Sequence, residues 1–205
     1  DLPSRLNIPK DADFLYLCSN ETVNGTEFRE NGIQIPERNQ LNKTKLIMDM
    51  SSDFMMKKIN WNNLDMVFAC SSKNMGVAGA NVVILRKDLL DYIKNINHYI
   101  PSILDWKLYI NTNSLYNTPA IFNLYLFDYI INDYIKKYKT IEQLSNYNQN
   151  KAELLYDFFD TNNNFNLNVK NKLARSNINI PFIVENGNKD VHSDFLKHCY
   201  ENNLV

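Results

Sequence analysis

Short runs of apolar residues, rich in β-branched and aromatic side chains, recur in the first half of the chain. They cover residues 14–18, 45–48, 66–69 and 81–85, and polar or glycine-containing segments separate them. Runs of this length and composition are typical of β-strands. Because the apolar residues are continuous rather than alternating, the pattern predicts strands that are covered on both faces.

The second half of the chain shows helical spacing. Over residues 120–137, one helical face carries Ile121, Leu124, Ile131 and Ile135. Pro119 precedes this segment and fits the first helical position. Because apolar side chains lie on nearly every side, we expect a deeply buried helix. Its aromatic residues are then expected in the core, and they are Phe122, Tyr125, Phe127 and Tyr129.

Further patterns predict helices over residues 150–159 and 191–201 and a strand over residues 179–184. Strands thus dominate early and helices dominate from 120 to 160, after which a new strand–helix unit begins. This change predicts a domain boundary near Lys139. We expect residues 1–139 to form part of an α/β domain with a mainly parallel sheet and flanking helices. Residues 140–205 are expected to be an incomplete, smaller α+β domain.

Composition excludes several classes of protein. The 205 residues include 22 basic and 23 acidic side chains, so the net charge of -1 indicates neither a nucleic-acid nor a membrane-surface partner. No stretch approaches the roughly 18 apolar residues of a membrane span. The three cysteines are an odd number and lie far apart, which indicates no disulfide framework, and we expect no metal site. Because residue 1 is Asp, we expect a piece of a longer protein.

Candidate chemistry lies at the ends of two expected strands. Lys73 follows the strand at 66–69 and precedes Gly76 and Gly79. Open α/β sheets bind ligands at the carboxyl ends of their strands, and a partly desolvated lysine there is a competent amine nucleophile. The competing interpretation is an exposed loop lysine, which spacing alone favours.

Asp49 ends the strand that begins at residue 45. An isolated Asp at such a place is usually a cap or turn residue. Beside Lys73 it has a second interpretation, because a carboxylate facing a pyridine nitrogen and a lysine that forms an aldimine are the two groups that a pyridoxal phosphate site needs. The 24 positions from Asp49 to Lys73 fit one crossover between neighbouring parallel strands.

At these residues the chain resembles the phosphoserine aminotransferase family. Seven motifs of that family are matched in order, by CSNET at 18–22, MDMSSDF at 48–54, SKNMGVAG at 72–79, VVILRKDLL at 82–90, PSILD at 101–105, SLYNTP at 114–119 and KAELLY at 151–156. Their order and spacing make the resemblance specific. It extends over most of the chain but covers only the middle part of the family's length.

The resemblance implies a fold type I, class V transferase that uses pyridoxal 5'-phosphate. It implies that Lys73 forms the internal aldimine and moves the proton, and that Asp49 pairs with the pyridinium nitrogen. Thr22 is implied to hydrogen-bond the phenolic oxygen of the cofactor. Asn117 and Thr118 are implied to reach across a homodimer interface to the cofactor phosphate of the neighbouring subunit.

The chain also departs from the family pattern. Ser72 stands where the family usually has Gln, so the resemblance implies a weaker or water-bridged phosphate contact there. Val77 replaces a proline. The segment from Arg175 to Phe182 keeps the first arginine of a family motif and has Asn177 in place of the second. The family's phosphate-cradling glycine loop and its substrate-binding His-Arg motif are expected upstream and downstream of these 205 residues.

The activity implied by the resemblance is transamination of 3-phosphohydroxypyruvate with glutamate, giving phosphoserine and 2-oxoglutarate in serine biosynthesis, in a cytoplasmic homodimer. A second interpretation is a catalytically incompetent remnant that acts as a structural or interaction module, and the 205 residues alone are expected to lack activity. A third is another class V relative, a serine-glyoxylate transaminase or a cysteine desulfurase. Those share the Asp and Lys but lack the run at 18–22 and the Asn-Thr-Pro contact.

Overall fold

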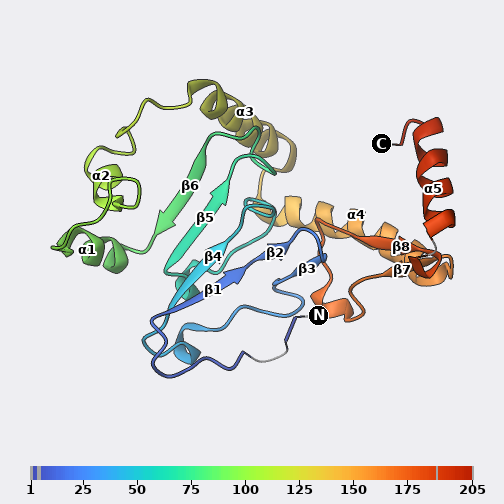
Figure 1. The fold of residues 1–205 in the computed structure, drawn as a ribbon, viewed down its shortest axis with the longest axis horizontal. Coiled ribbons are helices and arrows are strands. Elements are labelled where there is room, and N and C mark those ends of the chain that lie inside the picture. Colours follow the sequence, from blue (N-terminus) through green and yellow to red (C-terminus); the bar gives the residue numbers. More distant parts are fainter. Residues whose placement is uncertain (1, 4–5, 188, 205) are drawn as a thin grey trace.

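The structure is a computed structural model that describes residues 2–3, 6–187 and 189–204. Asp1 and Val205, the outer limits of the two expected domains, lie outside the described residues. Figure 1 shows a central sheet built from the first half of the chain, with helix α3 (Ile121–Tyr138) at its upper end and the C-terminal elements extending to the right.

Four strands form the central sheet: β1 Phe14–Cys18, β4 Lys45–Asp49, β5 Met66–Cys70 and β6 Asn81–Leu85. Their spatial order is β1-β4-β5-β6. The β1–β4 and β4–β5 pairs are parallel, whereas β6 runs antiparallel to β5. The four predicted strands and the mainly parallel sheet are therefore confirmed, as is the parallel crossover between the strands that precede Asp49 and Lys73.

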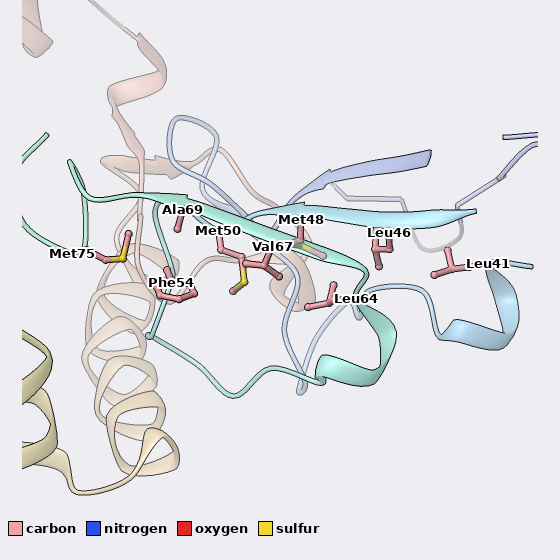
Figure 2. Packing of buried hydrophobic residues seen from close by; sticks show 9 residues of the cluster. All are labelled: Leu41, Leu46, Met48, Met50, Phe54, Leu64, Val67, Ala69 and Met75. Atoms are coloured by element: carbon pink, nitrogen blue, oxygen red, sulfur yellow. The ribbon is translucent and has the colours of Figure 1, made fainter. Parts of the chain in front are cut away.

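One face of this sheet carries the core. Side chains alternate along β4 and β5, and Figure 2 shows Met48 and Val67 on the same side, facing the segment that follows β4. On the other face Tyr16 is 57% exposed and Val83 44% exposed. The prediction that both faces are covered was wrong. A continuous apolar run reports strand formation, but it does not reveal whether the same chain supplies cover for each face.

Helices α1 Lys87–Asn95, α2 Trp106–Asn111 and α3 Ile121–Tyr138 follow β6. The predicted deep burial of α3 was wrong, because Ile121 is 67% and Ile135 59% exposed. Apolar residues surround this helix, yet the chain packs against only one of its sides.

The aromatic residues of α3 divide in the same way. Phe127 packs against the core, as expected. Phe122, Tyr125 and Tyr129 are exposed, so the core prediction was wrong for these three. Pro119 lies before the N-cap residue Ala120 rather than at the first helical position, so that placement was wrong as well.

The second half contains α4 Ile141–Thr161, β7 Phe165–Leu167, β8 Phe182–Val184 and α5 Lys189–Glu201. Helix α4 includes the predicted segment 150–159 but begins nine residues earlier, where Thr140 caps it by accepting a hydrogen bond from the Gln143 N–H. Strand β8 pairs antiparallel with β7 and begins just after Pro181, which has no N–H to donate. The boundary near Lys139, between α3 and α4, stays a prediction.

Smaller elements complete the described chain. Strands β2 Asn20–Glu21 and β3 Thr26–Glu27 form a short antiparallel hairpin directly after β1. Short 3₁₀ turns cover Arg38–Gln40, Trp61–Asn63, Lys172–Ala174 and Glu185–Gly187. The core of the second half is a cluster of phenylalanine rings, in which Phe159 stacks on Phe182 with centroids 4.6 Å apart.

A buried ion cluster joins the hairpin to the segment after β4. The Lys57 ammonium lies 2.6 Å from an Asp53 oxygen and 3.1 Å from a Glu27 oxygen. These side chains are 14%, 0% and 2% exposed. Burial by itself lowers the pKa of Lys57, but the two carboxylates outweigh burial and raise this pKa above its ordinary value. The second oxygen of Glu27 accepts the backbone N–H of Asn177 at 2.7 Å, which attaches the second half of the chain.

A second ion pair anchors the end of α4. Both oxygens of Asp160 accept hydrogen bonds of 2.8 Å from the Arg175 guanidinium, and Lys172 adds a third contact of 2.8 Å. Arg175 also lies over the Tyr156 ring, 4.9 Å from its centroid. Hydrogen bonds from Arg175 and then Lys172 hold the pKa of Asp160 well below its usual range.

The ion cluster predicts a large effect of Lys57→Met on stability. This change leaves two buried carboxylates without their shared counter-ion, so we expect the free energy of unfolding to fall by about 3–5 kcal/mol in urea denaturation. Lys58→Met is the matched control, because Lys58 is exposed, and it should change stability by less than about 0.5 kcal/mol. Equal unfolding midpoints for the two variants would contradict the assignment.

The Asp160 pair predicts a pH dependence. Because the folded-state pKa of Asp160 is depressed, its contribution to stability is present above the unfolded pKa of about 3.9 and is lost as pH falls below it. The stability difference between the natural chain and Asp160→Asn should therefore be largest near neutral pH and shrink below about pH 4. Asp157→Asn, one turn earlier on α4 and exposed, should show a much smaller difference. A difference for Asp160→Asn that is constant with pH would exclude the ion pair as its source.

Candidate active site

Lys73 lies in the turn that connects β5 to β6. The turn needs two glycines, because Gly76 has a φ of +137° and Gly79 a φ of +127°, which other residues rarely adopt. A Cβ atom on Gly79 would lie 2.7 Å from the Asn123 amide nitrogen on α3, so the turn also packs closely on that helix. The part of the turn that follows Lys73 is therefore fixed by its glycine conformations and by its contact with α3.

The Lys73 amine is directed to a second predicted residue. Its Nζ donates a hydrogen bond of 2.7 Å to the Thr22 hydroxyl, which follows β2 in the hairpin. Lys73 itself is exposed, so the described chain does not desolvate the amine. Thr22 is 51 positions away in sequence, and the structure brings the two together at one edge of the sheet.

Asp49 ends β4 at the same edge. Strands β4 and β5 are parallel neighbours, so the segments that leave their carboxyl ends, Asp49 and the turn with Lys73, emerge side by side. One Asp49 oxygen accepts the Ser51 backbone N–H at 2.9 Å, and the other accepts the Tyr16 hydroxyl at 3.1 Å. The carboxylate is thus held by two donors from different segments.

Tyr16 is a site residue that the sequence analysis missed. Burial and then the neighbouring Asp49 carboxylate raise the pKa of Tyr16 to about 12, so its hydroxyl remains a donor. The two-residue alternation of side chains along a strand could have identified it. Cys18 pairs with Asp49 across the ladder, and residues two apart on a strand share a face, which places Tyr16 on the side of Asp49.

Ser72 precedes Lys73 in the chain, but its side chain contacts Cys70. Its hydroxyl is 3.2 Å from the Cys70 sulfur. Hydrogen bonds from the Ser72 and Ser51 hydroxyls, with a smaller effect of the Lys73 charge, lower the pKa of the Cys70 thiol. A phosphate contact of Ser72 stays a prediction.

Asn117 and Thr118 are not brought to Lys73. Both are exposed on the segment between α2 and α3. The Asn117 amide nitrogen lies 3.5 Å from the Tyr109 hydroxyl, within the same region. Their predicted role in a neighbouring subunit remains a prediction.

The arrangement at the sheet edge suits a cofactor that carries a carbonyl group and a pyridine ring. An exposed primary amine can attach to a carbonyl carbon, and an oriented carboxylate can pair with a protonated ring nitrogen. Lys73, Thr22 and Asp49 are the residues that could hold such a group. Within the described ranges, no cluster of His, Cys, Asp and Glu is arranged to bind a metal ion, and no helix has the length and apolarity to cross a membrane.

Comparisons with known proteins agree with this geometry. The sequence profile of the class-V aminotransferases matches residues 3–201. A phosphoserine aminotransferase of Campylobacter lari is 34% identical over 95% of this chain and 51% of its own length, and a chloroplastic one of Arabidopsis thaliana is 33% identical over 95% and 44%. The chain therefore spans about half the length of the curated relatives it matches.

Solved structures give the same result. Phosphoserine aminotransferase from Bacillus circulans subsp. alkalophilus superposes with a TM-score of 0.84 at 30% identity, covering 96% of this chain and 51% of that one. A pyridoxal-phosphate-bound phosphoserine aminotransferase from Trichomonas vaginalis gives 0.83 at 33% identity, covering 97% and 53%. The predicted α/β architecture of fold type I pyridoxal-phosphate transferases is confirmed. The chain belongs to the class-V aminotransferase family.

Proposed function

We propose that this chain supplies the lysine and the ring-facing aspartate of a pyridoxal-phosphate-dependent phosphoserine aminotransferase. The reaction exchanges the amino group of glutamate with the oxo group of 3-phosphohydroxypyruvate, giving 2-oxoglutarate and phosphoserine in serine biosynthesis. The observation that carries the proposal is the Lys73–Thr22 hydrogen bond of 2.7 Å at the sheet edge where Asp49 ends β4. Relatives named phosphoserine aminotransferase match over 95% of this chain in sequence and 96% in structure, and they support the substrate class.

Each residue has a task at a stated atom. When bound, pyridoxal phosphate supplies an exchangeable carbonyl and an electron-accepting ring. Lys73 Nζ would be the attachment point and the proton carrier, and Thr22, which accepts a hydrogen bond from this amine, would also bind the phenolic oxygen. Asp49 would keep the ring nitrogen protonated, and the Tyr16 hydroxyl and the Ser51 N–H hold its carboxylate in place.

The proposal includes a homodimer located in the cytoplasm. Asn117 and Thr118 would contact the cofactor phosphate of the neighbouring subunit, and Ser72 that of its own subunit. The exposure of Asn117 and Thr118 on the segment after α2 is compatible with a contact outside the chain. These assignments rest on the motif resemblance.

Two other functions fit the structure less well. A structural module would not need an amine, a hydroxyl and an oriented carboxylate at one sheet edge, so the geometry favours an enzyme. A serine-glyoxylate transaminase or a cysteine desulfurase would share Asp49 and Lys73. The chain's matches to phosphoserine aminotransferases reach 35% identity, whereas an alanine-glyoxylate aminotransferase from Nostoc shares 18%.

The proposal predicts that Lys73→Ala in the complete protein removes transamination. General acid–base catalysis alone contributes about 10²–10⁴-fold, and the covalent attachment is lost as well. We expect no measurable phosphoserine formation and no cofactor label after borohydride treatment. Lys87→Ala, which removes an exposed lysine at the start of α1, should keep both. A Lys73→Ala enzyme that retains more than a few per cent of natural turnover would exclude Lys73.

A graded effect is expected at Asp49. Asp49→Asn preserves shape but cannot keep the ring nitrogen protonated, so turnover should fall by about 10²-fold or more while the cofactor still binds. Tyr16→Phe removes one hydrogen bond to Asp49 and should lower turnover roughly 2- to 13-fold, the equivalent of about 0.5–1.5 kcal/mol. Steady-state kinetics and cofactor absorbance measure both. If Tyr16→Phe were as damaging as Asp49→Asn, the tyrosine would have a role beyond holding the carboxylate.

A further inference from the structure

A cavity of about 420 Å³ lies on the other face of the sheet from Asp49. Met48 and Met50 line it, and they alternate with Asp49 along the chain, so they point to the opposite side. The volume falls within the range of about 300–1,000 Å³ that is usual for small-molecule sites. Lys73, Thr22 and Asp49 are not among its lining residues. It is a separate space from the site described above.

The cavity has an apolar floor. Met48, Met50 and Leu64 are 2%, 2% and 5% exposed and belong to the hydrophobic core. Figure 2 shows these three side chains on one side of β4 and β5, with the segment that follows β4 below them. Ile35 and Ile59 also line the cavity and pack against the same core. Such a floor suits a hydrocarbon chain.

The wall of the cavity carries a cation with unused hydrogen-bond donors. Arg29 lines the cavity and is half-buried, and its guanidinium donates to the Asn177 side-chain oxygen at 2.9 Å and to the Lys172 carbonyl at 3.0 Å. Both acceptors are neutral. Arg29 Nε is buried and has no partner, and within the described part of the chain no carboxylate forms an ion pair with Arg29. A guanidinium has five N–H donors, so several remain for an anion.

The other charged side chains of the lining do not occupy these donors. Lys57 is already paired with two buried carboxylates. Lys58 and Glu30 are exposed, and neither forms an ion pair with another described side chain. Arg29 and Lys58 against Glu30 carry one net positive charge, and Asp53 and Glu27 against Lys57 carry one net negative charge, so the charges of this region sum to zero. Arg29, whose Nε has no partner, lines the same cavity as the apolar floor, and a carboxylate matches the planar fork of arginine in two hydrogen bonds.

We propose that this cavity binds a small organic monocarboxylate. Its hydrocarbon part lies on Met48, Met50 and Leu64, and its carboxylate pairs with Arg29 while Lys58 contributes from the rim. Glu30 disfavours a second negative charge, which selects monoanions over dicarboxylates and phosphates. The inference does not depend on the proposed function, because the cavity and the Lys73 site share no side chain.

Hexanoate titration of the 205-residue chain tests the proposal, with methionine methyl signals observed by NMR. We expect saturable shifts for Met48 and Met50, whereas Met75, which is 1% exposed but does not line the cavity, stays unchanged. Hexan-1-ol and hexylamine should bind at least about tenfold more weakly than hexanoate, because they cannot form the charged pair with Arg29. Equal affinities for hexanol and hexanoate, or the absence of saturable shifts at Met48 and Met50, would overturn the proposal.

Variants separate the charge from the apolar floor. Arg29→Gln should weaken hexanoate about tenfold. Because Arg29 also holds Asn177, a second variant uses the exposed Lys58, and Lys58→Gln should weaken binding about two- to threefold. Ile59→Trp should fill the cavity and abolish the methionine shifts. Lys43→Gln, at an exposed lysine outside the lining, is the matched control and should bind normally.

Two outcomes among the variants would overturn the assignment. The first is a folded Arg29→Gln or Ile59→Trp chain that binds hexanoate with natural affinity. The second is loss of hexanoate binding in Lys73→Ala, which would place the carboxylate at the sheet edge instead of in the cavity. Unchanged binding in Lys73→Ala supports the cavity whether or not the proposed transaminase activity is found.

Discussion

The Lys57 ammonium, enclosed by the carboxylates of Asp53 and Glu27, is the interaction on which the arrangement of the other parts depends. Charges this deeply buried persist only when they are paired and hydrogen-bonded, so the three side chains fix the segments that carry them. Lys57 and Asp53 follow β4, whereas Glu27 belongs to the β2–β3 hairpin. The cluster therefore holds the hairpin that carries Thr22 against the strand that ends at Asp49. The same Glu27 accepts a backbone N–H from the second half of the chain, which extends the constraint across the molecule.

Asn20 adds specific hydrogen bonds to this contact between the hairpin and the rest of the chain. It is 1% exposed, and its amide nitrogen donates to Ser52 at 2.8 Å and to Asn179 at 2.7 Å, while its amide oxygen accepts from Ser176 at 2.5 Å. A fully buried amide that uses both its donors and its acceptor tolerates few other residue types. The motif at residues 18–22 thus contains Thr22, which belongs to the candidate site, and Asn20, which connects the hairpin to the second half of the chain. A motif match is consistent with both roles, and only the hydrogen bonds separate them.

The sequence predicted what depends on local chemistry and chain spacing. Strands appeared as β-branched runs, and Asp49 and Lys73 were paired because one crossover fits between them. Burial was harder to predict, since α3 is apolar on nearly every side whether or not the chain covers it. The early turns of α4 were missed because asparagine-rich helical sequence has weak intrinsic propensity, and a capping Thr140 with tertiary packing decides instead. Arg175 was noted as a motif residue, but its partner Asp160 comes from another element and no spacing rule identifies it.

Strand β4 serves two sites because its side chains alternate. Asp49 lies at the sheet edge that also carries Lys73, and it accepts a hydrogen bond from Tyr16. Met48 points to the other face and forms part of the apolar floor of the cavity. A slip of one residue in the pairing with β1 or β5 would exchange these faces and place a carboxylate in the core. The register that buries Met48 and Val67 is therefore the same register that exposes Asp49 to a ligand. Core packing, rather than any contact made by the site itself, selects the face on which the chemistry occurs.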